Sequence, residues 1–215
     1  MLHLHHHATV PTSETAQRHM TSKEVLVSNF DPLLDRNRVF AATGAHRGLG
    51  IMPSQPVFVV TCLDPRVDPA AFLGIGLGDA AVVRNAGGRV TEAVVDDVAF
   101  IGFLAATMLP EGPLFEVAVI HHTGCGTGFL ADPGFRSAYA AQVGANEEGL
   151  AAQAVTDPEA TVRADVARLL ASPKVSPRIT VAGYVYDLDA GLVRRIVAPA
   201  HPEQPEGVGA SSPRP

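Results

Sequence analysis

Two cysteines and a pair of adjacent histidines are the residues of this chain best suited to binding a metal ion. The only cysteines are Cys62 and Cys125, and His121 and His122 lie shortly before the second of them. Two thiolates and one imidazole form a ligand set that suits zinc. With no third cysteine, a closed site of three or four cysteines is impossible, whereas catalytic zinc sites use three protein ligands and leave the fourth position for water. We therefore expect one catalytic zinc ion, bound by Cys62, His122 and Cys125.

The choice between the two histidines rests on their spacing from Cys125. His122 precedes Cys125 by three positions, with Gly124 between them. A tight turn at this spacing lets both side chains converge on one ion. His121 is the competing ligand, and we expect it to face the other way and to pack in the core. A proton-shuttle role for His121 is a further alternative.

Asp64 and Arg66 follow the first cysteine at alternate positions. Alternate side chains of an extended segment share a side, so Cys62, Asp64 and Arg66 are expected to point into one crevice. Arg66 can hold the Asp64 carboxylate through two parallel hydrogen bonds. Asp64 would then accept a proton from metal-bound water. The alternative is a surface salt bridge worth about 0–1 kcal/mol. The position beside a metal ligand favours the catalytic interpretation.

Both clusters follow short apolar runs rich in β-branched residues, which are typical of strands buried on both faces. Three such runs occur, at residues 57–61, 80–83 and 117–120. Strands that alternate with helices predict an α/β fold with a mostly parallel sheet. In such sheets ligands bind beyond the carboxyl ends of the strands, at the point where strand order reverses. The two clusters are therefore expected to meet in one crevice.

The remaining elements follow from apolar periodicity and helix caps. We expect a helix from Ser22 that is kinked or split at Pro32, an amphipathic helix over 91–109, a helix that starts at Asp157-Pro158, and paired strands over 179–186 and 192–197.

The length of 215 residues suits one compact domain, which we place at residues 21–197. Residues 1–20 are predicted to be a disordered tail. Their histidine cluster could bind metal weakly, but a flexible tail or a cloning remnant is the favoured interpretation. Residues 198–215 are rich in proline and are predicted to be a second disordered tail.

Composition excludes several classes of partner. The formal charge of -6 gives no basic patch for a nucleic acid, and aromatic residues make up only 6% with no tryptophan for base stacking. No apolar run reaches the ~18 residues that span a bilayer, so we expect no membrane segment. The first twenty residues lack a secretion signal. A cytoplasmic location is the default expectation, and there the two cysteines would be free thiols or metal ligands.

Three motifs together resemble the β-class carbonic anhydrases, in particular a compact bacterial branch: Cys62-x-Asp64-x-Arg66, then Arg84-Asn85-Ala86-Gly87, then His122-x-x-Cys125-Gly126. The resemblance runs from about Asn37 to Val197. It implies a sheet of four parallel strands with a fifth strand at the edge, flanked by helices. It also implies a homodimer or a dimer of dimers in which N-terminal helices reach across to the partner.

The resemblance assigns roles as well. Cys62, His122 and Cys125 match the zinc ligands of the family, and Asp64 and Arg66 match the pair that controls the fourth coordination position. In some members this aspartate itself ligates zinc in a resting form. Pro65 stands where a small residue is common, and it would either hold the pair rigidly or disturb it.

The implied activity is the reversible hydration of carbon dioxide to bicarbonate and a proton, through zinc-bound hydroxide, in a dry apolar pocket that admits a small uncharged substrate. The first alternative is hydrolysis of carbonyl sulfide or carbon disulfide, which are linear isosteres that apolar contacts reject poorly. The second alternative is a zinc-binding dimer without turnover.

Overall fold

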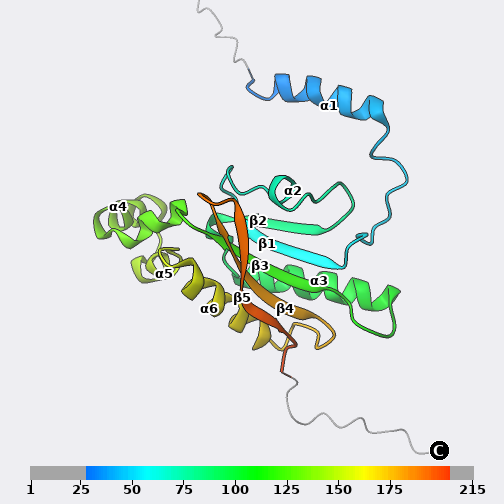
Figure 1. Cartoon of the computed structure of the whole chain (residues 1–215). Helices are drawn as coiled ribbons and strands as arrows, with labels where there is room; N and C mark the ends of the chain where they lie inside the picture. The colour runs from blue at the N-terminus through cyan, green and yellow to red at the C-terminus, as the bar shows by residue number, and fades with distance from the viewer. Residues whose placement is uncertain (1–27, 204–215) are drawn as a thin grey trace, which may run out of the picture. The chain divides into compact units, whose positions relative to one another are not determined.

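The computed structural model describes residues 28–203 (Figure 1). The chain divides into two compact units, residues 1–47 and residues 48–215, and each is described by itself. The predicted tail of residues 1–20 lies outside the described residues, as does the proline-rich segment from residue 204 onward. Within residues 28–203, no helix is both long and apolar enough to cross a membrane.

The described part of the first unit is built around one helix, α1 (Asp31–Thr43). Of the two predicted alternatives at Pro32, a kink or a split, the structure shows no kink: residues 28–30 are not helical, α1 begins at Asp31, and this proline lies in its first turn. The first turn has no hydrogen bond for a proline to remove. The proposed start at Ser22 lies outside the described residues. The helix ends at Gly44, whose left-handed backbone (φ +72°) and N–H bond to Ala41 O form the C-cap.

The second unit holds a five-stranded sheet of order β2-β1-β3-β4-β5. The first four strands of that order are parallel and β5 is antiparallel to β4, which confirms the predicted architecture. The strands are β1 (Val57–Cys62), β2 (Ala81–Asn85), β3 (Glu116–His122), β4 (Thr180–Asp187) and β5 (Leu192–Ala200). β5 thus continues past residue 197, where the predicted domain ends. Pro199 is tolerated there because β5 lies at an edge of the sheet.

The helices of this unit begin at polar caps or prolines. Thr91, Asp132, Asn146 and Asp157 each accept a hydrogen bond from the first turn of the helix that follows. The helices are α2 (Pro69–Phe72), α3 (Glu92–Met108), α4 (Pro133–Val143), α5 (Glu147–Ala152) and α6 (Pro158–Leu170), with two 3-10 turns, η1 (Ala86–Gly88) and η2 (Gly126–Ala131).

One face of the sheet carries the main core. Val60 of β1 and Val119 of β3 pack there with Val98 of α3 and Val166 of α6, and all four are buried. Figure 1 shows α3 and α6 on this side and α2 on the opposite side. On that opposite face a smaller cluster forms around Val59, Ala118 and Ile120.

Two predicted elements differ in exposure from the sequence pattern. β2 was expected to be buried on both faces, but its residues alternate between half-buried and exposed, and Val82 is 41% exposed. The cause is its place at the edge of the sheet. α3 was expected to be amphipathic, yet its outer face presents Phe100 and Phe103, which are 64% and 74% exposed. The second half of α3 is therefore apolar on both faces, whereas its first half carries the exposed Glu92, Asp96 and Asp97.

Candidate metal centre

The strand ends bring the predicted ligands together. Cys62 is the last residue of β1 and His122 is the last residue of β3, and these neighbouring parallel strands flank the point where strand order reverses. Gly124 turns the chain back through a left-handed conformation (φ +63°) and so places Cys125 beside His122. One ligand atom from each of Cys62, His122 and Cys125 lies within 4.8 Å of the others, and all three residues are buried.

The environment of His122 leaves one nitrogen free for a metal ion. Its Nδ1 lies 2.9 Å from the carbonyl oxygen of Thr123, a contact in which Nδ1–H donates. This bond leaves the lone pair on Nε2, as in many metal-bound histidines. Nε2 is buried and has no hydrogen-bond partner among the described residues. Burying an unpartnered polar atom is costly, so a metal at this nitrogen explains the arrangement.

The two sulfur atoms lie 3.9 Å apart, well beyond the ~2.05 Å of a disulfide. The hydrogen bond from the Cys62 thiol is the chief cause that lowers the pKa of Cys125, and the same bond raises the pKa of Cys62. Both sulfurs must lose their protons to bind a metal ion, so metal binding at this site releases protons.

His121 points to the opposite side of β3 and is fully buried. Its Nδ1 lies 2.8 Å from Thr161 Oγ1, and its Nε2 lies 3.2 Å from both Gly88 O and an Asp165 carboxylate oxygen. Its two ring nitrogens therefore have partners away from the cysteines. The structure gives His121 the core position that its place in the strand suggests.

The guanidinium of Arg66 holds the Asp64 carboxylate with two hydrogen bonds, from Nε at 2.9 Å and from Nη2 at 2.7 Å. The backbone N–H of Arg66 donates to the same carboxylate at 2.9 Å. These bonds lower the pKa of Asp64 to about 2. Arg66 Nη2 also donates to Gly124 O at 3.0 Å, so one side chain joins the loops after β1 and β3.

Pro65 fits the turn that carries this pair. The N–H of Val67 donates to Asp64 O at 3.0 Å and closes a four-residue turn with Pro65 at its second position. The fixed φ of proline suits that position, and aspartate is favoured at the first. Of the two alternatives for Pro65, the structure therefore favours a residue that holds Asp64 and Arg66 in place.

Two supporting residues were not predicted. Arg84 donates to the carbonyls of Cys62 at 3.0 Å and Asp64 at 2.8 Å, and so fixes both ends of the loop after β1. Gly88 has a positive φ of +67°, and a Cβ there would lie 2.9 Å from the Cys62 nitrogen. Arg84 belongs to the quoted motif, but a single sequence does not show a contact to carbonyls on a neighbouring strand.

A pocket of about 380 Å³ opens beside the ligands. Its wall is mostly apolar, with Asp64, Thr127, Tyr139 and Gln153 as polar members. The lining includes Cys62, Leu63, Pro65, Ala86, Gly87, Leu130, Phe135 and Leu150. The sequence did not predict the part of the wall that η2, α4 and α5 contribute. The lining residues of these elements belong to no recognised motif, and only the folded chain brings them beside the ligands.

Comparisons with known proteins agree with this architecture. A family model described as carbonic anhydrase matches residues 57–193. A β-carbonic anhydrase of Mycobacterium tuberculosis is 30% identical over 160 residues, which cover 74% of this chain and 93% of that protein. A crystal structure of a carbonic anhydrase from Streptococcus mutans superposes with a TM-score of 0.65 at 33% identity, covering 80% of this chain and 99% of that one.

More distant likenesses concern a piece of the chain or the fold alone. A carbon disulfide hydrolase from an Acidianus strain is 35% identical over 77 residues, 36% of this chain and 34% of that protein. A β-carbonic anhydrase of Sordaria macrospora, described as tetrameric, shares the fold at a TM-score of 0.55 and 19% identity, covering 80% of this chain and 98% of that one. From the family match and the relative aligned over nearly its full length, this chain belongs to the β-carbonic anhydrase family.

Proposed function

We propose that this protein binds one zinc ion through Cys62, His122 and Cys125 and catalyses the reversible hydration of carbon dioxide to bicarbonate and a proton. The observation that carries the proposal is the convergence of three ligand atoms within 4.8 Å, one of them from Cys62, which lines the same pocket as Asp64. Three ligands leave one coordination position for the reaction, as in catalytic zinc sites.

When bound at such a site, zinc lowers the pKa of a coordinated water to about 7 and so supplies hydroxide at neutral pH. The orientation of the reacting groups would come from residues of the chain. Asp64 accepts a hydrogen bond through its carboxylate and thereby orients the attacking oxygen. Arg66 fixes the direction of that carboxylate with its two hydrogen bonds. The resting role suggested by the family, in which Asp64 itself ligates the metal, requires Arg66 to release it.

The pocket favours a small uncharged substrate. Apolar side chains from Leu63, Leu130, Phe135 and Leu150 line the pocket beside Cys62. Carbon dioxide loses little solvation on entering such a space, whereas bicarbonate gains by leaving it for water. The wall thus favours both substrate entry and product release.

A stopped-flow assay of carbon dioxide hydration tests the proposal, with zinc content measured on the same samples. The wild-type protein is expected to be active, Cys125→Ser to lose both zinc and activity, and Asp64→Ala to keep zinc but lose most turnover. Equal activity in all three proteins would refute the mechanism. Zinc bound without any hydration from pH 6 to 9 would favour the alternative of a zinc-binding dimer without turnover.

A second activity has a specific observation in its favour, the likeness to the Acidianus carbon disulfide hydrolase. Carbonyl sulfide and carbon disulfide are linear and uncharged, and an apolar wall rejects such isosteres poorly. Release of hydrogen sulfide from either compound should therefore be measured beside carbon dioxide hydration. Faster turnover of a sulfur compound than of carbon dioxide would assign the enzyme to sulfide release.

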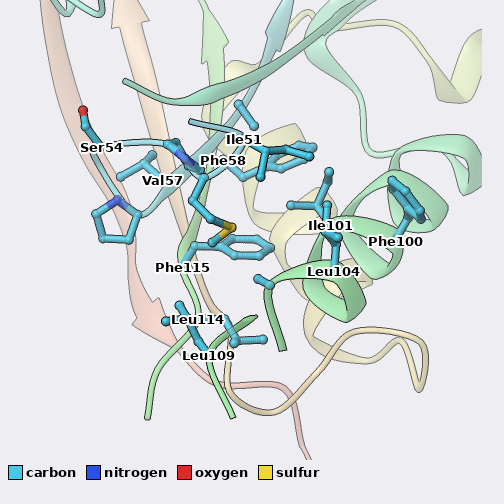
Figure 2. A pocket seen from close by; sticks show the side chains of 15 residues that line it. Ile51, Ser54, Val57, Phe58, Phe100, Ile101, Leu104, Leu109, Leu114 and Phe115 are labelled. Atoms are coloured by element: carbon cyan, nitrogen blue, oxygen red, sulfur yellow. The ribbon is translucent and has the colours of Figure 1, made fainter. Parts of the chain in front are cut away.

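We further propose that a second copy of this chain covers the outer face of α3. Phe100 and Phe103 are exposed on the second half of α3, which is apolar on both faces, and such apolar surfaces are normally covered by a partner. Beside them lies an apolar groove of about 490 Å³, with Phe58 and Phe115 at its base and Leu104 on its α3 wall (Figure 2). The tetrameric Sordaria protein with the same fold supports a copy of the chain as the occupant.

A further inference from the structure

The sulfur of Cys125 has a hydroxyl group beside it that the proposed mechanism does not use. Thr127 Oγ1 lies 3.2 Å from Cys125 Sγ. The side chain of Thr127 therefore supplies a polar contact to one proposed ligand. Thr127 also lines the pocket beside the ligands.

The direction of this hydrogen bond follows from the chemistry of the ligand. A metal-binding cysteine is a thiolate and carries no proton to donate. The hydroxyl of Thr127 must therefore donate to it. No other hydrogen-bond partner of this hydroxyl is found among residues 28–203. The bond is thus free to form whenever Cys125 binds metal.

Packing keeps the hydroxyl in place. A Cβ at Gly87 would lie 3.1 Å from Thr127 Oγ1 and 3.3 Å from Val155 Cγ2, so the missing side chain at Gly87 leaves the space that Thr127 fills. η1 and η2, which carry these two residues, also contact each other.

The other proposed thiolate ligand, Cys62, receives its hydrogen bond from the main chain. The sulfur of Cys62 receives the backbone N–H of Asp64 at 3.4 Å. Main-chain donors are present whatever side chain stands there. Only the hydrogen bond from the Thr127 hydroxyl to Cys125 depends on the side chain that the sequence places at its position.

We propose that Thr127 is a positioning residue for the metal centre, which holds the Cys125 thiolate through its hydroxyl and reduces the electron density that this sulfur gives to the metal. The inference rests on the proposed zinc site. A hydrogen bond to a ligand atom tunes the metal through that ligand, and removing such partners typically costs about 10–100-fold in metal affinity or activity. A less strongly donating sulfur leaves the metal a stronger Lewis acid.

The test compares Thr127→Val, which keeps the shape but loses the donor, with Thr127→Ser, which keeps the donor. Each protein is stripped of metal and loaded with Co²⁺, and the sulfur-to-cobalt charge-transfer absorption is recorded in the near ultraviolet. In Thr127→Val the band should move to lower energy, because the sulfur electrons lose the stabilising proton. In Thr127→Ser it should stay at the wild-type position.

Zinc affinity, measured by competition with a chelator, should fall about 10-fold in Thr127→Val and return close to the wild-type value in Thr127→Ser. The pH at which hydration reaches half its maximum should rise in the valine variant. Wild-type band position and zinc affinity in the valine variant would overturn the proposal, and so would equal shifts in both variants. If the valine variant does not fold, Thr127→Ala is judged by the same criteria.

The outcome separates this inference from the proposed function. A wild-type protein with no sulfur-to-cobalt band would contradict the metal site, and Thr127 with it. A band that responds to Thr127 in a protein without carbon dioxide hydration would contradict the proposed activity and leave the role of Thr127 standing.

Discussion

Arg66 is the side chain that connects the two loops of the metal centre. It holds Asp64 with two hydrogen bonds and reaches Gly124 O on the other loop. Arg66 lowers the pKa of the Asp64 carboxyl from the ordinary ~3.9 to about 2. It therefore changes the charge of Asp64 only below about pH 4. Asp64 is ionised at neutral pH with or without Arg66. At neutral pH the contribution of Arg66 is therefore orientation.

Arg66→Gln should lower carbon dioxide hydration at pH 8 by about 10-fold or more, while zinc content stays unchanged. The pKa of Asp64, followed by carbon-13 NMR of its carboxyl, should rise from about 2 toward its ordinary value. Because the folded-state pKa is the lower one, the pair stabilises the fold above pH ~4 and loses this contribution as pH falls toward 2. Arg194→Gln, which removes an exposed ion pair with Glu159, is the matched control. Full activity in Arg66→Gln would contradict the orienting role.

At the scale of single residues, the sequence predicted the site residues whose side chains can bind metal or carry charge. Cys62, His122, Cys125, Asp64 and Arg66 were chosen by residue type and by their place after apolar runs, and the structure brings them together. The sequence did not predict the residues that support the site through common hydrogen-bonding contacts. Arg84 binds two main-chain carbonyls and Thr127 offers a hydroxyl, and such contacts depend on which loops become neighbours in the fold.

Among the elements, η1 packs closely against β1, the strand that ends at Cys62. Gly88 has a positive φ, and a Cβ there would meet the Cys62 nitrogen and the Thr61 carbonyl carbon, both at 2.9 Å. Gly88→Ala should therefore push β1 away and lower both the thermal midpoint and zinc affinity. Gly112→Ala is the matched control, because Gly112 also has a positive φ (+81°) but has open space around it. The control should lose only the ~1–2 kcal/mol of left-handed backbone strain. Equal losses would show that contact with β1 is unimportant.

The buried carboxylate of Asp165 joins α6 to β3 and to the segment that follows η1. It accepts hydrogen bonds from Arg89 Nε at 2.8 Å and from the backbone N–H of Val90 at 3.0 Å, and it faces His121. Asp165→Asn should cost about 3–5 kcal/mol of unfolding free energy at pH 7, as expected when a buried ion pair loses one partner. Urea denaturation measures the loss, with the exposed Asp97→Asn as control.

The contribution of Asp165 to the free energy of unfolding should decrease as pH falls. Burial raises the pKa of Asp165, but the bonds from His121, Arg89 and Val90 outweigh it, so the net shift is downward. The carboxylate therefore stabilises the fold above the unfolded pKa of ~3.9, and this contribution disappears as pH falls below it. Between pH 5 and 3 the wild-type protein should lose more stability than Asp165→Asn. A parallel decline in both proteins would contradict an ionised, paired Asp165.

Sequence periodicity predicted most elements because the spacing of their apolar residues matches the face that each element buries. The runs in β1 and β3 were recognised as fully buried strands, and the cap at Asp157 marked the start of α6. The partial exposure of β2 was not predictable from its composition. Whether a strand lies at the centre or the edge depends on the order in which distant strands pair.

At the scale of the whole molecule, the proposed contact between two copies through the outer face of α3 predicts the mass of the protein in solution. Sedimentation of the wild-type protein should give at least twice the chain mass of 22.5 kDa. Phe103→Glu should shift it toward the single chain, because a charge buried at an interface is strongly unfavourable. Val143→Glu adds the same charge at the end of α4, where the residue is 50% exposed, and should leave the mass unchanged. A single-chain mass for the wild-type protein would contradict the proposed dimer.

The global topology was largely predictable, because alternating strands and helices permit few arrangements other than a mostly parallel sheet. The apolar pattern over 179–186 and 192–197 predicted the last two paired strands, and the family resemblance implied that the fifth lies at the edge. The apolar outer face of α3 was not foreseen, since Phe100 and Phe103 fall off the inner stripe and an isolated helix pattern does not reveal a second surface to be covered.

Zinc-edge X-ray absorption of the purified, zinc-loaded protein tests the three-ligand centre most directly. Two sulfur neighbours at about 2.3 Å and two nitrogen or oxygen neighbours at about 2.0–2.1 Å are expected, from Cys62, Cys125, His122 and the open position. Cys62→Ser should reduce the sulfur count to one or abolish binding. Protein that takes up no zinc, or zinc with fewer than two sulfur neighbours in the wild type, would contradict the proposed centre.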